Sequence, residues 1–302
     1  MNREKMELET VRFLKILFSL KEVEKVEIKE HVIASPEDTE NIRKAVSDSY
    51  HDHLSDVDMK IWVKLNPVDF SMKTPVYKAY FPRLQISDEI FGIIFQERDP
   101  AENREGLRIC MKSGFRMDLS FYLQCDENAD RLPEGDWWER EHGRENDACE
   151  GVHENAVKRN GNVCLAQEKA DSFWFIAVQA LTKLLRRDYL IADHLSHMLL
   201  MEGLVLQMEE RDKKYGTNFH RYGYAEELAY RTVSLAGYEK YLQGGDENYR
   251  YIAANLIRAA VSYDRLASEA DNHYVIRKEN FFEIWAAAIH RIETVEIVGD
   301  LE

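Results

Sequence analysis

The sequence has few residues that cross-link a chain or interrupt it. Its 302 residues include only four cysteines, and no two of them form a C-x-x-C pair. This spacing argues against a paired-cysteine zinc or redox site, so we expect reduced thiols. Only six prolines and 14 glycines occur, while 45% of the residues are hydrophobic and 11% aromatic. Such a composition is typical of a folded globular protein rather than a disordered one.

Long apolar runs and excess positive charge are also lacking. No run approaches the length of about 20 residues that spans a bilayer. The start of the chain has no secretory pattern, because Glu and Lys interrupt its apolar residues, and we expect a cytoplasmic protein with no membrane segment. The formal net charge of -15 argues against nucleic acid as a partner, since non-specific binding needs a basic face. An acidic surface suits a cationic or metal-borne ligand better.

The chain changes character along its length. Up to residue 125, β-type runs such as "MKIWVKL", "LRICM" and "FRMDLSFYL" are mixed with helical pieces, including "SPEDTENIRKAV" with Ser35 as expected N-cap. Residues 126–168 are polar and rich in turn formers, which indicates a connector or elaborated loop region. Residues 169–302 have helical periodicity. We therefore predict an α+β fold, with a mixed-sheet domain over 1–125 and an α-helical bundle domain over 169–302.

The helical half has one clear apolar stripe. It is formed by Trp174, Ala177, Val178, Leu181 and either Leu184 or Leu185. This spacing indicates a helix that packs in a bundle. We expect further helices over "YAEELAYRTVSLAGYEKYLQGG", over "ENYRYIAANLIRAAVSYDRLASEA" with Asp246 as N-cap, and over "NFFEIWAAAIHRIE".

Two carboxylates lie one residue apart in "SDSYHDHLSDVDMKIWVKLN", at the start of an expected strand. Side chains at i and i+2 of a strand point to one face, so Asp56 and Asp58 converge. Two such carboxylates repel each other unless they share a cation. Magnesium fits, because it prefers hard oxygen ligands and bridges to phosphate oxygens. A solvated strand edge explains most isolated D-x-D pairs, so the assignment depends on a second feature.

The second feature is an acid inside an apolar strand. "LRICMKSGFRMDLSFYL" predicts a β-hairpin that turns at 112–114, and its second strand carries Asp118 between Met117 and Leu119. An acid there is costly unless it meets a cation or a donor. A third carboxylate on a strand beside the first two would complete a metal site.

These motifs resemble a known superfamily. A serine motif, S-D-x-D before an apolar strand, and R-x-D-L on a later hairpin are similar to the nucleotidyltransferases. "FWFIAVQALTKLLRRDYLIADHL" and "GTNFHRYG" resemble the helical domain of antibiotic nucleotidyltransferases of the aminoglycoside 6-adenylyltransferase type, and the match runs from about residue 45 to 230. The resemblance implies that Asp56 and Asp58 hold Mg²⁺ against the phosphates of a nucleoside triphosphate, ATP, and that Asp118 completes the metal site or takes the proton of an acceptor hydroxyl.

The resemblance also assigns phosphate contacts and leaves two rival functions open. Ser47 and Arg116 are the expected nucleotide-binding residues, but the family has a Gly-Ser pair where this chain has Val46-Ser47. A valine at a point of close phosphate approach favours a catalytically decayed binding protein of the same fold. The Arg187 to His194 spacing resembles helical ribonucleases of toxin–antitoxin systems, which is the second rival.

The acceptor is expected to be a small polar molecule, in keeping with a role in antibiotic resistance. Asp193 and Glu202 on an expected helix predict an acidic pocket for a cation such as an aminoglycoside, although charges on a bundle helix are usually solvated. In the loop "GTNFHRYG", His220 and Arg221 are expected to shape the ligand cleft. The sequence leaves the acceptor, the nucleotide base and the oligomeric state open.

Overall fold

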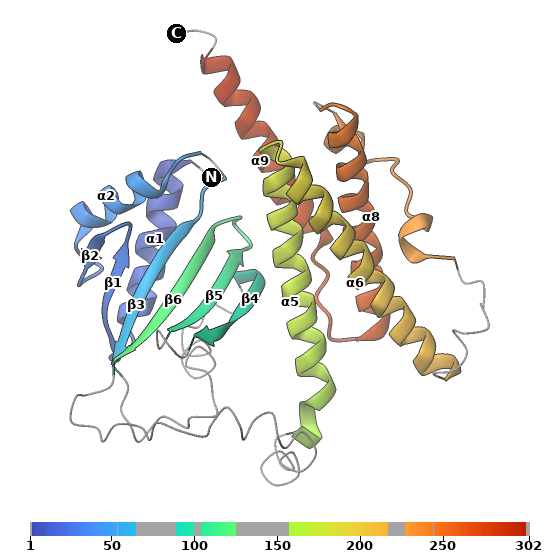
Figure 1. Cartoon of the computed structure of the whole chain (residues 1–302), viewed down its shortest axis with the longest axis horizontal. Helices are drawn as coiled ribbons and strands as arrows, with labels where there is room; N and C mark the ends of the chain where they lie inside the picture. Colours follow the sequence, from blue (N-terminus) through green and yellow to red (C-terminus); the bar gives the residue numbers. More distant parts are fainter. Residues whose placement is uncertain are drawn as a thin grey trace.

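The protein has a mixed six-stranded sheet followed by a set of packed helices, so it has the predicted α+β fold (Figure 1). The structure is a computed structural model that describes residues 2–52, 54–64, 89–99, 104–124, 157–216, 227–243 and 245–299. The elements before the helical half are α1 (Arg3–Phe18), β1 (Val23–Ile28), β2 (His31–Ile33), α2 (Thr39–Ser49), β3 (Val57–Lys64), β4 (Ile90–Asp99), β5 (Arg104–Met111) and β6 (Arg116–Gln124). The helical half consists of α5 (Val157–Leu185), α6 (Tyr189–Tyr215), the 3₁₀ helix η4 (Ala229–Thr232), α7 (Glu239–Leu242), α8 (Glu247–Ala270) and α9 (Lys278–Gly299).

The sheet has the order β2-β1-β3-β6-β5-β4, and its central pair, β3 and β6, is parallel. The other neighbouring strands are antiparallel, including the predicted β5–β6 hairpin. Side chains of β3 alternate between buried and more exposed positions, because α1 and α2 cover one face of this part of the sheet (Figure 1). Val57, Met59 and Ile61 therefore enter the first hydrophobic core, while Asp58 points to the other face.

A second core joins the helices to the far end of the sheet. It contains the predicted stripe of α5, and Leu184 rather than Leu185 is the fully buried member. Phe91 of β4 and Cys110 of β5 belong to this core. Burial raises the pKa of the Cys110 thiol to about 12, so it stays protonated. The helical half thus packs directly against β4 and β5.

The contact between β4 and α5 depends on a glycine. A Cβ atom at Gly92 would lie 2.3 Å from the backbone nitrogen of Phe175 and 2.9 Å from the carbonyl carbon of Trp174. Backbone atoms of a packed helix cannot move aside as a flexible side chain can. No side chain larger than hydrogen fits there without separating the strand from the helix.

Gly92→Ala is therefore expected to lower the free energy of unfolding by about 3 kcal/mol, the upper part of the usual range for overpacking. Denaturant unfolding of both proteins measures the change. Gly203→Ala in α6 is the matched control, because its Cβ would lie 3.9 Å from Ser262 Oγ, at ordinary contact distance. That variant should be no less stable than the wild type, since alanine favours helix over glycine. Equal unfolding of Gly92→Ala and wild type would show that α5 and β4 are not packed this closely.

Three local predictions from the sequence are wrong. The N-cap of α2 is Asp38, which accepts a hydrogen bond from the Asn41 amide, while Ser35 bonds to Glu37. Helix α5 begins at Val157, inside the segment expected to be a connector. Residues 227–243 contain only η4 and α7 as helices, because Val233 is extended and Gly237 has a positive φ of 91°. By contrast, Asp246 is confirmed as the N-cap of α8 by its bond from the Tyr249 amide.

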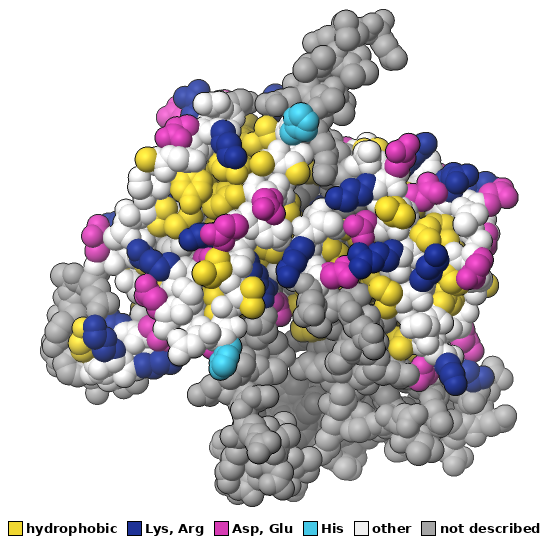
Figure 2. Space-filling view, turned by 180° about the vertical axis from the view of Figure 1, so that it is seen from behind, with side chains coloured by type: hydrophobic (Ala, Val, Ile, Leu, Met, Phe, Trp, Pro, Cys, Tyr) yellow, Lys and Arg dark blue, Asp and Glu magenta, His cyan; other side chains and the backbone are white. Residues whose placement is uncertain are grey.

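Among the helices in the described ranges, none combines the length and the apolar character that crossing a bilayer requires. Figure 2 shows the face opposite to that of Figure 1, where acidic and basic side chains are interspersed. On that face, the excess of acidic residues in the sequence therefore does not produce a patch of one charge.

Candidate active site

The site lies where the two parallel strands of the sheet begin. In the β3–β6 register, Asp58 is paired directly with Asp118, and Asp56 immediately precedes β3. Asp58 and Asp118 are about 60 residues apart in the chain, so their pairing depends on the contact between β3 and β6. The structure thus brings the predicted acids together at the N-terminal ends of the two central strands.

Two of these carboxylates form ion pairs with cations, one in the β1–β2 turn and one on β5. Lys29 Nζ lies 3.7 Å from Asp58 Oδ2, and Lys29 occupies the turn between β1 and β2 with a positive φ of 46°. Arg108 Nε lies 3.0 Å from Asp118 Oδ2. Arg108 and Asp118 are cross-strand partners in the β5–β6 hairpin, so the pairing follows from the register. The Arg108 Nε lacks hydrogen-bond geometry, and the contact is an ion pair rather than a directed bond.

The third carboxylate faces an arginine that is almost buried. Arg116 Nη2 lies 3.8 Å from Asp56 Oδ2 and donates a hydrogen bond to the Leu54 carbonyl. Because its guanidinium holds the segment that leads into β3, Arg116 fixes where Asp56 lies. The sequence predicted a phosphate contact for Arg116, and the geometry adds this positioning role.

Asp118 differs electrostatically from a solvated aspartate. Its burial raises the pKa, the Arg108 guanidinium lowers it, and the negative charges of Asp56 and Asp58 raise it again. The resulting pKa of Asp118 is about 6. A carboxylate that titrates near neutral pH is suited to accept a proton in a reaction.

The segment between α2 and β3 is held by a turn and by an ion pair to the helical half. Ser55 Oγ accepts bonds from the amides of His51 and Asp52. Arg186, which follows α5, makes two bonds to Asp52, from Nε to Oδ2 at 3.0 Å and from Nη2 to Oδ1 at 2.8 Å. Burial alone would raise the pKa of Asp52, but the bonds from Arg186 and from the Leu54 amide lower it overall. Asp52 is therefore ionised, and the Arg186 guanidinium balances its charge.

Ser47 and Val46 lie elsewhere than the motif predicted. Both are on α2, where Val46 is fully buried in the first core and Ser47 is exposed. Val46 therefore does not line a phosphate-binding turn and cannot block one. The serine adjacent to the carboxylates is Ser55, which the S-D-x-D motif contains.

The chemistry of these residues suits magnesium, but their side chains are not arranged around one point. All three acids offer hard oxygen atoms, and their mutual repulsion contributes to the raised pKa of Asp118. In the part of the chain that the structure describes, however, no three His, Cys, Asp or Glu side chains are clustered as metal ligands. Asp56 and Asp58 have side chains 43% and 59% exposed, so rotation toward a shared ion meets little hindrance.

A small cavity lies beside Arg116, between the sheet and helices α5 and α9. It has a volume of about 40 Å³, and Thr182 of α5 and Ile284 of α9 contribute to its lining. This is room for one water molecule, whose share of liquid volume is about 30 Å³. A nucleoside is much larger and does not fit there.

The residues expected to bind an acceptor do not join the carboxylates. Asp193 and Glu202 are on α6, which packs on α5 and α8 rather than on the sheet. Asp193 pairs with His197 one turn later, with Nδ1 to Oδ1 at 3.3 Å. His220 and Arg221 lie outside the described residues. The acidic acceptor pocket stays a prediction.

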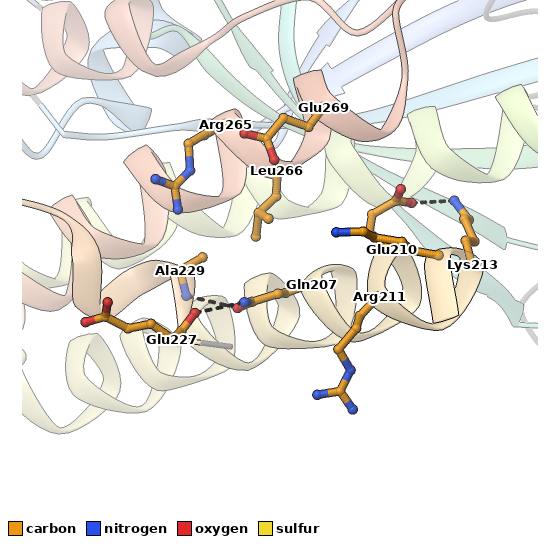
Figure 3. A pocket seen from close by; sticks show the side chains of 10 residues that line it. Gln207, Glu210, Arg211, Lys213, Glu227, Ala229, Arg265, Leu266 and Glu269 are labelled. Atoms are coloured by element: carbon orange, nitrogen blue, oxygen red, sulfur yellow. Dashed lines mark hydrogen bonds and ion pairs between the residues drawn. The ribbon is translucent and has the colours of Figure 1, made fainter. Parts of the chain in front are cut away.

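A larger pocket of about 500 Å³ lies between α6, α8 and residues 227–229 (Figure 3). Gln207 closes one side, donating to the Glu227 carbonyl and accepting from the Ala229 amide. Acidic and basic side chains both line it, and an ion pair joins Lys213 to Glu210. None of its lining residues comes from the sheet.

Comparisons with known proteins add little. No protein-family model and no curated protein matches the sequence. Among solved structures, an aminoglycoside 6-adenyltransferase from Bacillus subtilis is similar at 13% identity over 96% of this chain and 99% of that chain, with a TM-score of 0.27. The α+β architecture described above therefore stands on the sheet and helices of this chain.

Proposed function

We propose that this protein is a metal-dependent nucleotidyltransferase that transfers a nucleoside monophosphate, AMP from ATP, to a hydroxyl of a small polar acceptor. The observation that carries the proposal is the parallel register that pairs Asp58 with Asp118, next to Asp56. This register places three acids at the start of the two central strands, and the pKa of one of them, Asp118, is about 6. The S-D-x-D and R-x-D-L motifs, which resemble those of nucleotidyltransferases, supply these three residues.

Asp56, Asp58 and Asp118 are the residues that would hold Mg²⁺. The bound ion would neutralise charge on the attacking and leaving oxygens during transfer. Asp118 either completes this metal site or accepts the proton of the acceptor hydroxyl, whose oxygen forms the new bond to the α-phosphorus as the bond to pyrophosphate breaks. Arg108 holds a positive charge beside the Asp118 carboxylate, and Arg116 fixes the segment that carries Asp56.

A catalytically decayed nucleotide-binding protein is the second candidate. The observation that favours it is that Lys29, Arg108 and Arg116 already pair with the three acids. In this alternative the ion pairs are permanent and the acids do not reorganise around a metal. The two functions differ in what the protein does once a nucleotide is bound.

Ligand-induced stabilisation tests whether the carboxylates bind Mg²⁺ and nucleotide. Mg²⁺ with ATP should raise the melting temperature of the wild type, because a ligand at 100 times its Kd adds about 2.7 kcal/mol to the folded state. Asp58→Asn should lose this gain. Glu40→Gln is the control, because Glu40 is an exposed acid on α2 that pairs only with Lys44 among the described contacts, and it should respond as the wild type does.

Transfer itself is then measured with labelled ATP and a panel of hydroxyl-bearing acceptors that includes aminoglycosides. Labelled product with release of pyrophosphate supports the enzyme. Stabilisation by ATP without transfer to any acceptor supports the decayed binding protein. An unchanged melting curve at millimolar ATP, together with no transfer, rejects both.

A further inference from the structure

Helix α6 carries an apolar stripe that faces solvent. Of the large hydrophobic side chains that are exposed in the described residues, Ile191, Met198, Met201, Val205 and Met208 all lie on this helix. Met201 is the most exposed of these five, at 57%. We call these five residues the α6 seam. Exposed apolar residues scattered singly need no explanation, but a contiguous row of them marks a contact surface.

The seam is separate from the face that α6 buries inside its own chain. Ala192, Ser196, Leu199 and Gly203 are the buried residues of the helix, and Gly203 lies close to Ser262 of α8. A surface helix normally has polar residues opposite its buried stripe. Helix α6 instead has apolar residues on two faces, and only one of them is covered.

The spacing of the seam is that of a coiled-coil contact. With His194 included, its positions follow each other at alternating intervals of three and four residues from Ile191 to Met208. This is the a/d heptad pattern by which one helix packs along another. The stripe extends over 18 residues, about 27 Å at 1.5 Å per residue.

We infer that the α6 seam joins two copies of this chain through an antiparallel pair of α6 helices around a two-fold axis. With the axis between Leu199 and Leu200, Met198 packs on the partner's Met201 and Ile191 on the partner's Met208. The same register sets His194 against Val205. Four of the five seam residues thus face another seam residue and Val205 faces His194, so the contact is self-complementary.

Charge at the ends of the seam favours the antiparallel direction. In this direction the start of each α6, which directly follows Arg187 and Asp188, lies near the end of the other α6, which carries Asp212. Arg187 is exposed in the link between α5 and α6. A parallel pair would instead oppose Arg187 to Arg187, Asp212 to Asp212 and His194 to His194. Like charges directly opposite each other disfavour that arrangement.

The test measures mass in solution by analytical ultracentrifugation, using the full chain. The wild type at tens of micromolar is expected at twice the chain mass of 35.4 kDa. Met198→Glu with Met201→Glu places acids opposite acids in the proposed register, and the dimer should be lost. Met198→Glu with Met201→Lys places an acid opposite a lysine twice, and the dimer should be restored.

Two controls keep the result specific. Leu8→Glu changes an apolar residue on α1 that is more exposed than Met198 or Met201 and lies away from the seam, and it should leave the dimer intact. Far-ultraviolet circular dichroism should show unchanged helix content in every variant, because the substituted side chains are exposed. A monomeric wild type overturns the proposal. So does a Glu/Lys variant that dimerises no more tightly than the Glu/Glu variant, because only the antiparallel register places each new acid opposite a new lysine.

Discussion

Asp118→Asn is expected to lower nucleotidyl transfer by about 10²–10⁴-fold, the usual contribution of a positioned proton acceptor. The substitution keeps the shape of the side chain but removes its ability to take a proton. Steady-state kinetics with labelled ATP measure the loss. If Asp118 acts mainly as a base, the affinity for ATP should change little, whereas a metal ligand would lose affinity as well. Transfer at the wild-type rate would remove Asp118 from the site.

The same variant is expected to be more stable than the wild type when no metal is present. Asp118 has a folded-state pKa of about 6 against an ordinary value of 3.8. The folded protein therefore binds the proton more tightly than the unfolded chain, and wild-type stability should fall as pH rises from about 4 to about 6. The difference corresponds to at most about 3 kcal/mol at neutral pH. Asparagine avoids this cost, because it carries no charge in the partly buried position.

Urea unfolding in the presence of a chelator, at pH 4 and at pH 7.5, measures this effect. The two proteins should have nearly the same stability at the lower pH, and Asp118→Asn should be the more stable at the higher pH. Glu40→Gln serves again as the control, since Glu40 is exposed and its ion pair with Lys44 is also exposed. A variant that is less stable than wild type at pH 7.5 would mean that the ion pair with Arg108 outweighs the cost of burying the charge.

The opposed effects of one substitution link the fold to the proposed chemistry. A residue that only supports the fold loses stability when it is replaced by a close isostere. A functional residue held in an unfavourable environment gains stability and loses activity. Asp118 is partly buried, has like charges nearby and is paired with an arginine that does not form a directed hydrogen bond. Such an environment is typical of a site where reactivity, rather than stability, determines the residue.

Local sequence patterns were sufficient for part of this site. The turn at 112–114 determines the β5–β6 register, so the pairing of Arg108 with Asp118 can be predicted from the hairpin alone. Lys29 and Arg186 could not be found in that way. Lys29 reaches Asp58 only because β1 pairs with β3, and Arg186 reaches Asp52 only because α5 packs against the sheet. Contacts between distant segments leave no local periodicity.

The wrong predictions have a similar origin. Ser35 and Asp38 are both good N-cap residues. The Ser35 hydroxyl bonds to Glu37, whereas Asp38 accepts a bond from the Asn41 amide, and a sequence pattern does not rank these side-chain bonds. Val46 was interpreted through a motif alignment, but the helix continues past it and buries it in the core. The apolar stripe of α5 was predictable because it repeats over several turns of one helix, and a repeated pattern is a stronger signal than a single residue.

Arg277 connects the helical half to the sheet through several buried bonds, and its loss should destabilise the fold strongly. It lies between α8 and α9, and its guanidinium Nη1 donates to Asp171 Oδ1 at 2.6 Å and to the Phe91 carbonyl at 2.8 Å. Its backbone amide donates to Asp264 Oδ1, which also accepts a bond from the Tyr274 hydroxyl. One side chain thus connects α5, β4 and the link between the last two helices.

Arg277→Met is therefore expected to lower the free energy of unfolding by about 3–5 kcal/mol, because it leaves the Asp171 charge and the Phe91 carbonyl without the guanidinium in a mostly buried place. Denaturant unfolding measures the loss. Adding Asp171→Asn should recover part of it, since the negative charge that Arg277 faced is then gone. Arg265→Met is the matched control on exposed α8 surface and should change stability by no more than about 0.5 kcal/mol. If Arg277→Met loses no more than this control, the helical half is not held to the sheet through Arg277.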